Sequence, residues 1–217
     1  TASGGPFLNK SIEDLKHVTL EEALKHPTWN MGKKITIDSS ALINKGLELI
    51  EATYLFNIDH KNIKIVVHPQ SIVHAMLSMQ DGTTISLMSK ADMKIPISDA
   101  IFENGESPVF GNLRTSDIKN LTFCDLDNEK FPTINMARDA IDQGMSSIIT
   151  YNAASEVAVE NFISKKISFL DIYKVIKESI KNSKKIEQKV SKNNIEHILL
   201  FNKKARDFAA NIIEEVL

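Results

Sequence analysis

The sequence has very little cysteine and no large excess of either charge. Cys124 is the only cysteine among 217 residues, which excludes an intrachain disulfide and a zinc site built from several cysteines. The formal net charge is −2, so nucleic acid and anionic membranes are not the expected main partners. No apolar run approaches the length of a membrane span. What remains is a chain long enough to bury a real core, in one large domain or two small ones.

The first residues also lack the features of a targeting segment. Residues 1–7 resemble neither a signal peptide nor a transit peptide, and they begin without Met. We interpret them as a loop from the middle of a longer chain, with any targeting segment upstream. Lysine far outnumbers arginine, and asparagine and isoleucine are frequent, which we attribute to an AT-rich genome.

The most informative stretch is residues 35–56. Ile35 and Ile37 alternate with polar neighbours, which predicts a short half-buried strand. Residues 38–40 can supply N-cap oxygens to a following helix over residues 41–56. The apolar positions expected to face a core on that helix are Leu42, Leu49 and Phe56.

The predicted strand and helix bring together four polar side chains, Ser39, Asn44, Lys45 and Glu48. Asn44 and Glu48 are one turn apart and stack on one face. Free amides at a helix N-terminus favour an anion, and the hydroxyl, amide and ammonium groups suit a phosphate. Glu48 would repel that phosphate unless it binds a divalent cation or a sugar hydroxyl at the other end of the ligand. The alternative is an ordinary capped amphipathic helix with Lys45 and Glu48 in solvent.

Two loops near this stretch can serve a ligand or only the fold. Residues 3–6 form a Gly-rich loop that can bring amides close to a ligand or make a plain turn. Residues 26–33 contain the only tryptophan, Trp29, beside Met31 and before Gly32. An aromatic residue on such a loop suggests a lid that excludes water. The competing interpretation is that Trp29 fills a core.

The remaining N-terminal half predicts short elements. Capping boxes at Ser11 and Thr19 predict two short helices over residues 12–17 and 20–25. Further along the chain we expect strands at 63–68, 72–79, 83–88 and 121–124, with a hairpin at Asp81-Gly82 and a short helix at 97–102. His68 and His74 could be ligands, although neither has metal-type spacing and a structural role is favoured for each.

From residue 131 onward the pattern is helical. Helices are expected at 134–143, 147–164, 169–180 and 195–216, with Gly144 as a C-cap and residues 181–194 as a solvated hinge. The last helix should bury an apolar stripe of Ile195, Leu199, Phe208, Ile212 and Val216. The predicted class is α+β: a small mixed-sheet catalytic domain over residues 1–104, a linker over 105–130 and a C-terminal helical bundle over 131–217.

Four motifs, taken in order, carry a resemblance to a known family. They are Ser3-Gly-Gly-Pro-Phe7, His26-Pro-Thr-Trp-Asn-Met-Gly32, Asp38-Ser-Ser-Ala-Leu-Ile-Asn-Lys-Gly-Leu-Glu48 and His68-Pro-Gln-Ser-Ile-Val-His74. Together they resemble the 1-deoxy-D-xylulose 5-phosphate reductoisomerase family, over essentially the whole chain. Enzymes of this family make 2-C-methyl-D-erythritol 4-phosphate in non-mevalonate isoprenoid biosynthesis, using NADPH and Mg2+ or Mn2+, and they form homodimers.

The resemblance implies a role for each matching residue. His26, Lys45 and Glu48 are the catalytic candidates, and Glu48 is the metal carboxylate. The substrate-binding candidates are Ser3, His26, Trp29, Ser39, Asn44 and Lys45; the cofactor-binding candidates are Gly32 and Met93; and the lid is supported by Met31 and His74.

The chain departs from the family pattern in what it lacks. No Gly-x-Gly-x-x-Gly motif is present, and the family's Asp and second Glu for the metal are also missing, so we expect the NADPH domain to lie upstream and this chain alone to be inactive. Thr28 stands where an Asn is common.

The alternatives are another metal-dependent sugar-phosphate isomerase or aldolase without nicotinamide, and a non-catalytic helical interaction module. The pathway suits a plastid-type organelle or a bacterial cytoplasm, and the composition tilts the expectation toward the organelle.

Overall fold

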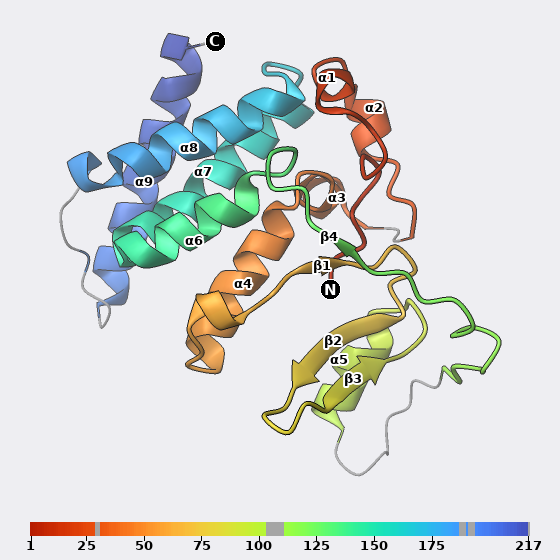
Figure 1. The fold of residues 1–217 in the computed structure, drawn as a ribbon. Helices are drawn as coiled ribbons and strands as arrows, with labels where there is room; N and C mark the ends of the chain where they lie inside the picture. The colour runs from red at the N-terminus through yellow and green to blue at the C-terminus, as the bar shows by residue number, and fades with distance from the viewer. Residues whose placement is uncertain (29–30, 103–110, 187–189, 191–193, 217) are drawn as a thin grey trace. The chain divides into compact units, whose positions relative to one another are not determined.

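The computed structural model describes residues 1–28, 31–102, 111–186, 190 and 194–216. The contacts of the chain define two compact units (Figure 1). The first comprises Thr1–Gly4, Pro27–Asn30 and Ile65–Leu126, and the second comprises Gly5–His26, Met31–Lys64 and Asp127–Leu217. The α+β class is confirmed, with two small sheets in the first unit and helices throughout the second. In the described part of the chain, no helix has both the length and the apolar character of a membrane span.

The first unit contains short antiparallel sheets and one helix. Strand β1 (Val66–Val67) pairs with β4 (Cys124–Asp125), and β2 (Val73–Ser78) pairs with β3 (Thr84–Met88). Ala2 adds a parallel bridge to Val67, so both strand orientations occur. The predicted hairpin at Asp81-Gly82 is therefore confirmed, whereas the strands expected at 63–68 and 121–124 are much shorter. Helix α5 (Lys94–Ile101) begins before Pro96 and includes that proline in its first turn, where a missing amide costs nothing.

The second unit opens with two short helices, α1 (Ile12–Leu15) and α2 (Leu20–Ala23). Both predicted capping boxes are present. The Ser11 hydroxyl accepts from the Asp14 amide at 3.1 Å, and the Glu22 carboxylate accepts from the Thr19 amide at 2.8 Å. Each helix ends two residues before its expected end.

The strand predicted at residues 35–37 is wrong, because helix α3 spans Lys33–Ser40. Two hydroxyls stabilise this helix from inside: Thr36 Oγ1 donates to the Gly32 carbonyl at 2.9 Å, and Ser40 Oγ donates to the Thr36 carbonyl at 2.8 Å. These bonds satisfy polar groups that are buried in the core. An alternation over only three residues is too short to tell a strand from a helix that is buried on several sides.

Helix α4 (Ile43–Leu55) starts two residues later than expected, and a 3-10 turn, η1 (His60–Asn62), follows it. Leu42 and Leu49 are buried as predicted. The expectation for Phe56 is wrong, since this side chain is 69% exposed beyond the end of the helix.

The rest of the second unit is the predicted helical bundle, with α6 (Thr133–Gln143), α7 (Met145–Ile163), α8 (Phe169–Ile186) and α9 (Ile195–Val216) (Figure 1). Helix α7 contacts α6, α8 and α9. Gly144 ends α6 at a φ of 99°, as its predicted cap role requires. Helix α8 runs through the first part of the predicted hinge, because the hydroxyl of Ser183 is buried against that of Ser147 at 2.7 Å.

The apolar stripe expected on the last helix is partly wrong. Ile195 and Leu199 are 72% and 62% exposed, while Ile212 is buried. The buried positions of α9 also include Phe201, Ala205 and Ala209. The small alanines allow close packing against α7, and Arg206 beside them pairs with Glu156 of that helix. Tertiary partners therefore select a face about one residue away from the most hydrophobic stripe.

Candidate functional site

The candidate site is built around the corner between α3 and α4. Ser39 lies in the last turn of α3, so the prediction that it caps the next helix is wrong. The N-cap of α4 is instead Leu42, which has a φ of 54° and makes no side-chain capping bond. Left-handed backbone at a leucine costs on the order of 1–3 kcal/mol and persists only where the surroundings impose it. Asn44 and Lys45 still occupy the first turn of α4, where backbone amides are free to face an anion.

Buried hydroxyls tie this corner to three other segments. Ser40 Oγ lies 2.7 Å from the Ala23 carbonyl oxygen, so its single proton is shared between this carbonyl and that of Thr36, and the contact ties the end of α3 to α2. Thr133 Oγ1 of α6 donates to the Ala41 carbonyl at 2.9 Å. Tyr151 of α7 donates to the Ile43 carbonyl at 3.3 Å. Together these bonds supply the tertiary constraint that the strained residue between them requires.

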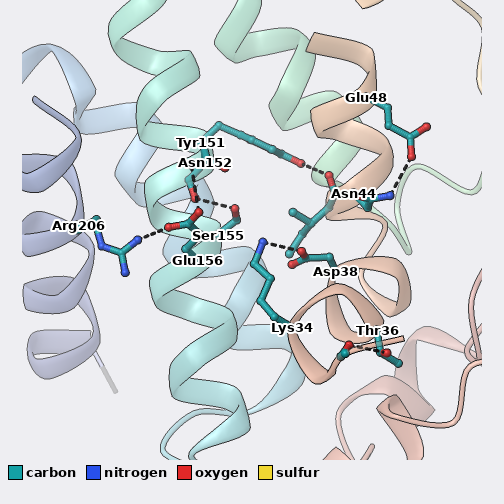
Figure 2. Close-up of polar contacts among 12 residues, drawn as sticks. Lys34, Thr36, Asp38, Asn44, Glu48, Tyr151, Asn152, Ser155, Glu156 and Arg206 are labelled. Atoms are coloured by element: carbon teal, nitrogen blue, oxygen red, sulfur yellow. Dashed lines mark hydrogen bonds and ion pairs between the residues drawn. The ribbon is translucent and has the colours of Figure 1, made fainter. Parts of the chain in front are cut away.

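The predicted stacking of polar groups on α4 is present. Asn44 Nδ2 donates to Glu48 Oε1 at 2.8 Å (Figure 2). The Lys45 ammonium forms an ion pair with Oε2 of the same carboxylate. The Lys45 side chain is 19% exposed and that of Glu48 is 45% exposed. The cluster thus combines two donors with one carboxylate that solvent can reach.

His26 contacts Ser39, which lies 13 residues further along the chain. The His26 Nε2 and Ser39 Oγ atoms are 3.1 Å apart. Burial lowers the pKa of the His26 imidazole below its usual value, which favours the neutral ring. A neutral imidazole can donate from one nitrogen and accept at the other, so this pair could bind hydroxyl or phosphate oxygens.

The Gly-rich loop approaches α3 at Gly5. Its φ is 66°, and a Cβ at this position would lie 3.0 Å from the Ser39 carbonyl oxygen. Both the conformation and the space therefore require glycine. The loop brings backbone close to the helix that carries Ser39, in the unit to which both belong.

Other predicted site residues are spread over the two units. Gly32 is the N-cap of α3, with Met31 directly before it. Ser3, His74 and Met93 belong to the first unit, where Met93 precedes α5 and is 52% exposed. Trp29 lies outside the described residues.

The His74 ring is held within the first unit. Its Nε2 lies 2.8 Å from Ser89 Oγ, and that hydroxyl donates to the Lys90 carbonyl at 2.9 Å. These two contacts fix the orientation of the ring within the unit. His68, which was expected to be structural, is fully buried, contacts the Thr122 carbonyl at 2.8 Å and stacks on Phe123.

Within the described residues, no three His, Cys, Asp or Glu side chains gather as a metal site would require. Glu48 offers one carboxylate. A single carboxylate suits a cation such as Mg2+, which commonly keeps most of its waters. Its other ligands would come from a substrate or from another part of a protein.

Sequence reasoning missed two residues beside the corner. Asp38 is buried, and its Oδ2 lies 2.6 Å from the Lys34 ammonium (Figure 2). The four-residue spacing of this pair is a helical signal that the strand prediction concealed. Tyr151 carried no signal of its own, because its partner at residue 43 is 108 positions away in the sequence.

The chain was compared with protein families and with characterised and solved proteins. Residues 88–208 match the DXP reductoisomerase C-terminal domain, and residues 1–56 match the 1-deoxy-D-xylulose 5-phosphate reductoisomerase C-terminal domain. A reductoisomerase of that name from Colwellia psychrerythraea is 39% identical over 100% of this chain and 52% of its own length. One from Clostridium tetani is 46% identical over 88% of this chain and 50% of its own length.

Solved structures of reductoisomerases are also similar to this chain. A DOX-P reductoisomerase in complex with NADPH, fosmidomycin and magnesium superposes with a TM-score of 0.91 at 37% identity, covering 98% of this chain and 54% of the solved one. The enzyme from Zymomonas mobilis in complex with NADPH gives 0.89 at 34% identity, with 99% and 55% covered.

Fold and site together define an α+β polypeptide with a polar cluster at the start of one helix and a helical C-terminal half. The family matches and the solved relatives make the assignment specific. The chain belongs to the 1-deoxy-D-xylulose 5-phosphate reductoisomerase family. It spans about half the length of the curated relatives that it matches.

Proposed function

We propose that this chain is the catalytic and C-terminal part of an enzyme that converts 1-deoxy-D-xylulose 5-phosphate to 2-C-methyl-D-erythritol 4-phosphate with NADPH and Mg2+ or Mn2+. The observation that carries the proposal is the meeting of Asn44, Lys45 and Glu48 on the first two turns of α4, in a chain of this family. A solved relative that holds NADPH, fosmidomycin and magnesium supports the same cofactors for this chain.

The substrate phosphate is assigned to the donors near the corner. The Lys45 ammonium and the Asn44 amide lie in the first turn of α4, where the helix dipole also favours negative charge. Ser39 and, from the family resemblance, Ser3 complete the set. A phosphate held far from the reacting carbons orients the substrate, and its binding energy can be used at the reacting centre. On substrate binding, Lys45 would exchange part of its pairing with Glu48 for the phosphate.

Glu48 is the carboxylate that would hold the divalent cation. When bound, such a cation supplies Lewis-acid stabilisation of negative charge on substrate oxygens. Asn44 donates to Oε1 of Glu48 and thereby orients the carboxylate. The remaining ligands are assigned to the substrate, water and carboxylates of the upstream part of the enzyme.

The remaining roles follow the family pattern. His26, whose pKa is lowered by burial and whose ring contacts Ser39, is assigned to the substrate. Trp29 and Met31 are assigned to a lid that excludes water, His74 to the support of that lid, and Gly32 and Met93 to the nicotinamide cofactor. The division into residues 1–104, 105–130 and 131–217 stays a prediction.

A homodimer formed through the β2–β3 hairpin is also proposed. Leu77 pairs with Ile85 and Ala75 with Leu87, which places four apolar side chains on one face of the hairpin. Leu77, Ile85 and Leu87 are 58%, 60% and 51% exposed. A contiguous exposed apolar face of this kind commonly marks an interface.

The relatives reported above come from bacteria, and they favour the bacterial cytoplasm over a plastid-type organelle as the compartment.

The test is substitution of the two charged residues in the full-length enzyme. Lys45→Ala and Glu48→Ala should each lower turnover by about a hundredfold, because both groups act on charge at the bound ligand. Lys177→Ala, which removes an exposed ammonium from α8, is the matched control and should leave turnover unchanged. Wild-type turnover in both site variants would contradict the proposal and favour a non-catalytic helical module.

A second measurement separates the nearest alternative, a sugar-phosphate isomerase or aldolase that works without nicotinamide. The full-length enzyme should consume NADPH in proportion to the substrate converted. Substrate conversion without NADPH oxidation would favour the alternative.

A further inference from the structure

Tyr151 of α7 reaches the phosphate-site helix at the turn that carries its functional groups. The side chain is fully buried, and its hydroxyl donates to the Ile43 carbonyl at 3.3 Å, directly before Asn44 (Figure 2). Ile43 is the first residue of α4, so this bond fixes the backbone where the helix begins. A bundle helix therefore holds the part of α4 from which Asn44 and Lys45 project.

Gly46 provides the space for this contact. A Cβ at residue 46 would overlap the Tyr151 hydroxyl oxygen and would lie 3.0 Å from Tyr151 Cζ and 3.2 Å from the Ala137 Cβ. Gly46 lies inside the helix, where glycine is less favourable than alanine by about 0.8–1.0 kcal/mol when no packing reason exists. The packing reason here is the phenol, which occupies the volume that a side chain would need.

The position of this contact along α4 gives it a consequence for binding. Asn44 and Lys45 lie between the residue whose carbonyl accepts from Tyr151 and the glycine that accommodates the ring. Leu42, immediately before Ile43, has left-handed backbone that only its surroundings can impose. A shift of the phenol would therefore move the two donors together with the helix start.

We propose that Tyr151 is a positioning residue for the phosphate site, acting through Gly46 and the Ile43 carbonyl. It touches no substrate atom in this assignment. Its effect is on where the Asn44 amide and the Lys45 ammonium stand when a phosphate arrives. The inference rests on the proposed function, since it assumes that these two groups bind the substrate phosphate.

The experiment is a suppressor test in the full-length enzyme, with 1-deoxy-D-xylulose 5-phosphate as substrate. Gly46→Ala should raise KM by about tenfold or more, because small displacements of binding groups are costly. Adding Tyr151→Phe to that variant removes the hydroxyl oxygen that the new methyl group overlaps. The double variant should therefore recover a large part of the lost affinity. A purely structural lesion would lower the melting temperature and kcat along with affinity, whereas lost positioning raises KM while the melting temperature and kcat stay near their wild-type values.

Tyr173→Phe is the matched control. Tyr173 is also a buried tyrosine of the bundle, and its hydroxyl makes no hydrogen bond within the described residues. Its removal should leave KM and the melting temperature unchanged or slightly improved. Should Gly46→Ala fail to fold, Tyr151→Phe alone decides: a raised KM beside an unchanged Tyr173→Phe variant supports the proposal, and a wild-type KM overturns it.

Other outcomes are equally decisive. An unchanged KM in Gly46→Ala, or no recovery in the double variant, would overturn the positioning role. Lys45→Ala measured in the same assay separates this failure from that of the proposed function. If Lys45→Ala raises KM while the Tyr151 and Gly46 variants do not, the phosphate site stands and the positioning role is lost. If Lys45→Ala binds substrate normally, the phosphate assignment itself is wrong, and the positioning role falls with it.

Discussion

At the scale of single residues, Asp38 is a buried carboxyl of the second unit. Its side chain is 1% exposed and pairs with Lys34 at 2.6 Å. Burial raises the pKa of the Asp38 carboxyl, the Glu156 carboxylate raises it further, and Lys34 opposes both effects. Glu156 itself pairs with Arg206 of α9 (Figure 2). The residue next to Ser39 thus feels a charge of its own helix, Lys34, and one of the helical bundle, Glu156.

A pH experiment on Asp38 follows from the direction of that shift. A carboxyl whose folded-state pKa lies above its unfolded value of about 3.9 contributes stability at low pH, and this contribution is lost as pH rises through the folded-state pKa. Asp38→Asn removes the effect. We therefore expect the free energy of unfolding of the variant, relative to wild type, to improve steadily as pH rises above about 4.

Urea denaturation of both proteins at a series of pH values measures the difference. Asp59→Asn, at the exposed cap of η1, is a control that should not show the same trend. If the Asp38→Asn variant instead lost stability relative to wild type as pH rose, the pairing with Lys34 would outweigh burial.

At the scale of elements, features that depend on nearby residues were predicted correctly, whereas features that depend on tertiary contacts were not. The capping boxes of α1 and α2 and the β2–β3 hairpin were predicted correctly, because each depends on residues within a few positions of one another. Helix α3 was mistaken for a strand, because the burial of its residues 36–38 and 40 depends on neighbours outside the segment. The buried face of α9 was displaced for the same reason, since α7 and not hydrophobicity alone selects it.

The hairpin provides a prediction at this scale. In the full-length protein, Leu77→Lys should convert a dimer to a monomer, because it places a charge at the centre of the apolar face of β2 and β3. Met76→Lys adds the same charge on the opposite face of the same strand and is the control. Sedimentation at several protein concentrations measures the change. A dimer that survives Leu77→Lys would exclude this face as the interface.

At the scale of the whole molecule, this chain spans about half the length of its curated relatives. The two units hold the predicted substrate, lid and metal residues in the described part of the chain, apart from Trp29. Glu48 alone supplies too few ligands for a tight divalent-metal site. We therefore expect the proposed activity to depend on groups beyond those described for this chain.

The corresponding prediction is that residues 1–217 alone do not oxidise NADPH when Mg2+ and 1-deoxy-D-xylulose 5-phosphate are added. The full-length enzyme under the same conditions is the positive control. NADPH absorbance over time is the measurement. Clear oxidation by the isolated chain would show that it holds a complete cofactor and metal site.

The sequence by itself determined the family, the hairpin, the caps and the stacking of Asn44 on Glu48, because motifs and near-neighbour spacing are written along the chain. Only the tertiary structure decided how α4 begins. The Thr133 bond and the Tyr151 phenol over Gly46 join segments about a hundred residues apart, and these contacts impose the left-handed backbone of Leu42. No local pattern encodes such contacts, since they exist only after the bundle has packed.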